Sequence, residues 1–153
     1  MNLKLFISVF LLLSVNYVIA QNPGAFEEAQ NMTVHQFSKR IKKAKNPVLV
    51  CFETESNLAS IQQKNILNEI YEQYQLNLDI QLCDLERNPK LAAYFNLDSL
   101  PVLILYVDAY PLWLIFGKVE KEELMKCLEI YGIKFKERNR HEPEHASAVI
   151  NAR

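Results

Sequence analysis

The sequence predicts a three-layer α/β domain, in which helices cover both faces of a central mixed sheet of about four to five strands. Apolar runs of strand length alternate with segments of helical periodicity along most of the chain. This alternation is typical of parallel strands joined by right-handed helical crossovers. Two later apolar runs are separated only by a short turn at Asp108 and Ala109, which adds an antiparallel hairpin. With 153 residues, half of them apolar, the chain is long enough for one such domain.

The first twenty residues are predicted to be a signal peptide. Residues 1–20 carry a single charge, Lys4, followed by an apolar run and the small-residue ending Val18-Ile19-Ala20. A basic start, an apolar centre and such an ending mark a secretory signal. We therefore expect export to a periplasm, a secretory-pathway lumen or the medium, with cleavage near Ala20. An uncleaved anchor is the alternative, but the apolar run is short for a membrane span of about 20 residues.

The segment 21–32 is predicted to be an N-terminal linker, because its Pro-Gly pair favours a turn. Asn31 lies in a sequon for N-glycosylation, which applies only in a eukaryotic secretory pathway. The domain proper is expected to span 33–132. Thr33 is a suitable N-cap for a first helix whose apolar positions are Phe37 and Ile41.

Val48–Phe52 is predicted to be a strand buried on both faces, because it is apolar without alternation. The next helix is expected to run from about Leu58 to about Gln75, with Ser56 or Asn57 as its N-cap. Its apolar stripe has helical spacing and comprises Leu67, Ile70, Tyr71 and Tyr74.

A second strand is predicted over 78–82. Asn88-Pro89 then starts a short helix through Phe95, with Asn88 as the cap. The hairpin strands are 102–106 and 112–116.

The last predicted helix spans about 120–131, with acidic residues in its first turn and Gly132 beyond its end. The polar segment 133–153 has no periodicity and is expected to be a disordered tail.

The charge balance excludes some partners. Without its first twenty residues, the chain has 16 basic and 18 acidic residues, a net charge of −2. This predicts neither nucleic-acid binding nor membrane adsorption after the signal is removed.

The three cysteines, Cys51, Cys83 and Cys127, form no Cys-x-x-Cys motif and no metal-ligand spacing, so we expect no metal and no cofactor. Each lies in an apolar segment, where a free cysteine commonly behaves as a small buried hydrophobe.

Taken together, the layout resembles the thioredoxin family from about Thr33 to Gly132. The match needs no gap from Val48 to Ile70, opposite the family's strand, Cys-Gly-Pro-Cys and helix. It also includes the Asn88-Pro89 helix start, the Leu100-Pro101 step before the hairpin, and Gly117 near the end of the last strand. The resemblance implies that Pro101 is a cis-proline beside the family's redox site.

The same resemblance shows that the family's redox centre is missing. It places the two redox cysteines at Asn57 and Ser60, so the chain reads Asn57-Leu58-Ala59-Ser60 where the family has Cys-Gly-Pro-Cys. The tryptophan before them corresponds to Ser56.

The residues at these positions cannot perform the family's reaction. Thiol–disulfide exchange needs a thiolate, which an amide cannot replace. A serine hydroxyl would need a neighbouring general base, and His35, His141 and His145 lie in the first helix or the tail. We expect Ser60 instead to hydrogen-bond within the first helical turn.

A replacement disulfide is also disfavoured. The resemblance places Cys51 and Leu82 where the family's buried aspartate and its lysine partner face each other, which puts Cys83 across the sheet. A bridge between Cys51 and Cys83 is therefore poor in geometry, and Cys127 on the last helix stays open as a partner for either thiol.

Three hypotheses of function follow. The first is a non-catalytic, chaperone-like or scaffold module that holds an extended peptide or protein segment by strand addition. Its groove would be formed by Ser56, Asn57, Leu58, Ala59, Ser60, Leu100 and Pro101. The alternative is a thiol–disulfide oxidoreductase of cell redox homeostasis with a non-standard cysteine, which requires an accessible thiol of low pKa.

The third hypothesis is self-association through the apolar edge strand 112–116. Core burial is the competing interpretation of Trp113.

Overall fold

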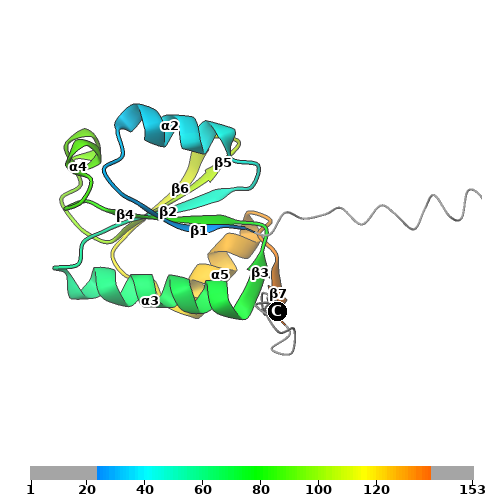
Figure 1. Ribbon diagram of the computed structural model, residues 1–153. Helices are drawn as coiled ribbons and strands as arrows, with labels where there is room; N and C mark the ends of the chain where they lie inside the picture. The colour runs from blue at the N-terminus through cyan, green and yellow to red at the C-terminus, as the bar shows by residue number, and fades with distance from the viewer. Residues whose placement is uncertain (1–23, 139–153) are drawn as a thin grey trace, which may run out of the picture.

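The computed structural model describes residues 24–138, in which a five-stranded mixed sheet lies between two helical layers (Figure 1). This confirms the predicted fold class. The sheet order is β1-β4-β2-β5-β6, with β1 and β2 parallel to β4, and β5 antiparallel to both β2 and β6. In chain order the elements are β1 Phe26–Ala29, α2 Val34–Lys43, β2 Val48–Glu53, α3 Leu58–Gln73, β3 Tyr74–Leu76, β4 Asp79–Asp84, α4 Pro89–Phe95, β5 Val102–Val107, β6 Tyr110–Phe116, α5 Lys121–Ile130 and β7 Phe135–Glu137. Within residues 24–138, no helix has the length and apolar character that a membrane crossing requires.

The core has two halves, one on each face of the sheet. All six residues of β2 are buried, and successive side chains point to opposite faces. Leu49 and Cys51 join the apolar cluster under α3 and α5, whereas Val50 and Phe52 join the cluster under α2 and α4 (Figure 1). The unbroken apolar run of this strand is explained by the two helical layers that cover it.

The linker predicted over 21–32 is wrong for Phe26–Ala29, which form β1. This edge strand pairs with β4, with Phe26 opposite Ile80 and Ala29 opposite Cys83. Its pattern was not recognisable because Glu27 and Glu28 are exposed and only Ala29 is fully buried.

The disordered tail predicted over 133–153 is wrong for its first residues. Ile133 is buried, and β7 pairs with β3, where the Phe135 and Tyr74 rings meet edge to face at 5.7 Å. This pairing also ends α3 at Gln73 instead of near Gln75. The predicted signal peptide and the segment 139–153 lie outside the described residues.

Asn88 joins the ends of two strands instead of capping α4 with its side chain. It is fully buried, and its Nδ2 donates to the carbonyls of Ala29 at 2.7 Å and Asp84 at 2.8 Å. Its Oδ1 accepts from the Met32 amide at 2.8 Å. The predicted side-chain cap of α4 is therefore absent, because the side-chain amide of Asn88 already hydrogen-bonds to these three backbone groups.

Replacing Asn88 is expected to destabilise the whole domain. Asn88→Ala removes three partners from buried backbone groups, so we expect the free energy of unfolding to fall by roughly 2–4 kcal/mol. Asn88→Asp keeps the shape and the acceptor for Met32 but loses both donors, and it should also be destabilising. Urea denaturation measures both changes, and an unfolding free energy equal to wild type in both variants would contradict this role.

Candidate functional site

The loops singled out in the sequence meet at one end of the sheet. Phe52 at the end of β2 lies opposite Val102 at the start of β5, and Val102 lies opposite Phe116 at the end of β6. The Gly117 amide donates to the Pro101 carbonyl at 2.8 Å, and the Leu100–Pro101 bond is cis. We call residues 54–60, 100–101 and 116–117 the loop end of the sheet.

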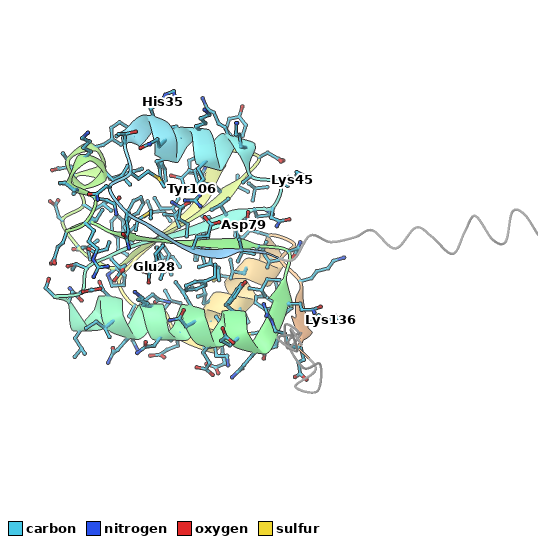
Figure 2. The ribbon with its side chains drawn as sticks, in the orientation of Figure 1. Glu28, His35, Lys45, Asp79, Tyr106 and Lys136 are labelled. Carbon is cyan, nitrogen blue, oxygen red and sulfur yellow. The ribbon has the colours of Figure 1, made fainter. Side chains whose placement is uncertain are left out.

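Asn57 and Ser60 make a helix cap at the loop end. Asn57 is the N-cap of α3, and its Oδ1 accepts from the Ser60 amide at 3.1 Å. The hydrogen bond expected of Ser60 is thus made by its backbone, whereas its fully buried hydroxyl has no partner within the described residues. No base serves this hydroxyl from α2, because Figure 2 shows His35 on the outer side of that helix, on the other face of the sheet.

Comparison with known proteins agrees with this geometry. No family model matches the chain. It is 33% identical over 64 residues to the thioredoxins of Staphylococcus aureus strains Mu50 / ATCC 700699 and MW2, a match that covers 42% of this chain and 62% of each relative. Its fold matches that of a mutant thioredoxin from Halobacterium salinarum NRC-1 with a TM-score of 0.59 at 17% identity, over 71% of this chain and 92% of that one. The fold is thioredoxin-like. The chain spans about three fifths of the length of the curated relatives it matches, and the structural likeness shows the fold alone.

The predicted groove residues of this thioredoxin-like fold differ in their access to solvent. Leu58 and Ser56 are exposed, and Asn57, Ala59 and Leu100 are partly buried. Ser60 and Pro101 are buried. The exposed rim therefore comes from the start of α3 and the loop before it.

Phe116 is a member of the loop end that the sequence did not single out. It is 60% exposed, and it stands next to Gly117, which is bonded to Pro101. The sequence signal that could have placed Phe116 at the loop end is its position directly before Gly117, which was part of the family resemblance.

Ser56 ties the loop after β2 to the loop after β4. Its hydroxyl donates to Glu86 Oε1 at 2.7 Å, and the Thr54 hydroxyl donates to the same oxygen. The hydrogen bond from Thr54, followed by that from Ser56, holds the pKa of Glu86 below its ordinary value. The position that corresponds to the family's tryptophan is thus part of a polar network.

Glu53 is a buried acid that sequence reasoning missed. It is 2% exposed, and its Oε2 has no hydrogen-bond partner among the described residues. Burial raises its pKa, and the charge of Lys64 on α3 opposes this shift. Lys64 pairs at 2.6 Å with Glu28, which Figure 2 shows on the α3 side of the sheet. Because the folded protein favours the protonated acid, this group lowers the free energy of unfolding as the pH rises above 4.5.

None of the three cysteines forms a disulfide. Cys51 lies opposite Leu82, so Cys83 points to the other face, in the cluster under α2 and α4. Burial raises the pKa of Cys51 strongly and that of Cys83 to about 12. Cys127 on α5 is partly exposed. Within the described residues, no group of three or more acidic, histidine or cysteine side chains is placed to hold a metal ion.

The Asn57 cap is expected to contribute measurably to stability. Asn57→Ala removes the acceptor of the Ser60 amide and should lower the free energy of unfolding by about 1 kcal/mol. Asn57→Asp keeps an acceptor at the helix N-terminus and should stay within about 0.5 kcal/mol of wild type. Urea denaturation followed by circular dichroism compares the three proteins. An alanine variant as stable as wild type would show that the cap is dispensable.

Thiol labelling should separate Cys127 from the two strand cysteines. With Ellman's reagent at pH 8, native protein is expected to label Cys127 first, because Cys51 and Cys83 are buried with raised pKa values. In Cys127→Ser, labelling should begin only on unfolding. Rapid labelling of this native variant would reveal an accessible strand thiol and favour the oxidoreductase alternative.

Proposed function

We propose that this thioredoxin-like protein is an exported, non-catalytic binding module that takes up extended, apolar polypeptide segments at the loop end of its sheet. The observation that carries the proposal is the exposure of Leu58 and Phe116, which we call the apolar rim, at an end of the sheet whose residues 54–60, 100–101 and 116–117 include no cysteine. Leu58 is 69% exposed and Phe116 is 60% exposed, although both are large apolar side chains. Large apolar side chains exposed at one end of a sheet are typical of a contact site.

The backbone at the loop end supports uptake of an extended segment. Among residues 24–138, neither the amide nor the carbonyl of Leu100 bonds to another backbone group, whereas the next carbonyl, that of Pro101, accepts from Gly117. An unpaired amide and carbonyl beside an apolar rim provide the two features of strand addition, namely main-chain hydrogen bonds and side-chain contacts.

The chemistry of the site favours binding over electron transfer. The two positions that the resemblance assigns to redox cysteines hold an amide engaged as a helix cap and a buried hydroxyl. The two strand thiols have raised pKa values, which disfavours the reactive thiolate. Export is proposed from the pattern of residues 1–20.

Substitutions on the rim should weaken binding selectively. The probe is carboxymethylated lactalbumin, a permanently unfolded chain without free thiols, and its affinity is measured by fluorescence anisotropy. We expect Leu58→Asp and Phe116→Asp each to raise the dissociation constant about tenfold, since burying one large apolar side chain contributes about 1.5–3 kcal/mol. Aspartate in the first turn of α3 favours the helix dipole, so Leu58→Asp should still fold.

The matched control is Ile130→Asp at the end of α5. Ile130 is 79% exposed, but α5 ends near β3 and β7, away from the loop end. This variant should bind like wild type. Wild type that does not bind the probe, or three variants with equal loss of affinity, would overturn the proposal.

A further inference from the structure

The outer strand of the hairpin, β6, carries large apolar side chains that none of the described helices covers. Leu112, Leu114 and Phe116 are 49%, 46% and 60% exposed, and we call them the edge patch. Trp113 and Ile115 alternate with them and pack against the cluster under α3 and α5. Trp113 is therefore partly buried against the core on one face of β6, as the competing interpretation expected. The edge patch on the other face is not covered by any part of the chain that the structure describes.

Among residues 24–138, β6 is also an open edge of the sheet, because it pairs only with β5. The Gly117 amide faces β5, since it donates to Pro101. Backbone groups of alternate residues in an antiparallel ladder face the same neighbour, so those of Ile115 and Trp113 also face β5. The amides and carbonyls of Leu114 and Phe116 consequently face the open edge.

Native proteins usually protect such an edge with charges, prolines or bulges. The seven residues of β6 include no charged side chain. Protection is confined to one end, where Pro111 lacks an amide hydrogen and the β5–β6 register shifts beside Leu112. From there to Phe116 the edge is open and apolar.

We propose that two copies of this chain associate by antiparallel pairing of their β6 strands, centred on Leu114, to form one continuous sheet. In this register Leu112 of each copy lies opposite Phe116 of the other, and Leu114 lies opposite itself. The edge patch thus meets only apolar residues.

Neighbouring registers are less favourable, which identifies a second copy as the fitting occupant. A centre at Trp113 would place Phe116 opposite Tyr110, at the end of the strand where Pro111 lacks an amide hydrogen. A centre at Ile115 would bring Lys118 opposite Leu112. The register centred on Leu114 instead places Lys118, which pairs with Glu120 of its own chain, beyond the apolar pairs and towards the acidic Asp108 turn of the second copy. The edge is therefore complementary to itself.

The contact is small, so the dimer is weak. One strand pair and three partly exposed side chains per copy bury less than the roughly 1,200–2,000 Å² of a standard stable interface. Dissociation is expected between about 1 μM and about 1 mM, as for other contacts below that size.

Analytical ultracentrifugation of the chain from residue 21 onward, which includes every described element, tests the proposal. Wild type should show a concentration-dependent monomer–dimer equilibrium across this range. Leu114→Lys and Leu114→Glu should each raise the dissociation constant at least tenfold, because like charges would lie directly opposite one another. Near-ultraviolet circular dichroism checks that both variants are folded.

Mixing the two variants provides the decisive measurement. Lysine opposite glutamate should restore association to within a few-fold of wild type, and Ile130→Lys, an exposed substitution on α5, should leave it unchanged. A wild type that is monomeric up to about 1 mM would overturn the proposal. So would Leu114→Lys dimerising like wild type, or a mixture that stays monomeric.

Discussion

The burial of β2 on both faces is the constraint on which the rest of this structure depends. A strand with six buried residues needs a neighbour on each side and a helical layer on each face. β4 and β5 provide the neighbours, and the pairs α2–α4 and α3–α5 provide the layers. Because β5 runs antiparallel to β2, the strand that follows Pro101 begins where β2 ends. The meeting of the loop after β2 with Pro101 therefore follows from the antiparallel pairing of β5 with the buried β2 strand.

Elements with a strong local pattern could be predicted from the sequence, and those that depend on distant partners could not. The strand at Val48, the long helix after it and the hairpin all have the apolar spacing of the structure they form. β1 has two exposed glutamates among four residues, and it is a strand only because β4 pairs with it. β3 and β7 have three residues each and depend on each other. Short strands of this kind leave no periodic signal.

The candidate site likewise combines residues predictable from the sequence with residues whose environment depends on distant partners. Asn57 was one of two candidate helix caps inferred from local spacing, and the place of Cys83 on the far face from Cys51 followed from the family resemblance together with strand alternation. The burial of Glu53 could not, because this residue reads as the first polar position after an apolar run. It is enclosed only when Asp84 lies opposite it and Lys64 approaches from α3. Long-range pairing determined which polar residues are hidden.

Cys51 and Leu82 lie side by side on β2 and β4, where the family resemblance implies an aspartate and a lysine. Burying such a charged pair removes two ions from water, and its replacement by well-packed apolar groups is often neutral or stabilising. The buried acid of this chain, Glu53, is instead two residues further along the same face. The interior beneath the start of α3 therefore holds a thiol and an apolar side chain where the resemblance implies an ion pair. Because neither side chain is charged or hydrogen-bonded across the pair, apolar replacements of similar volume should be accommodated at both positions.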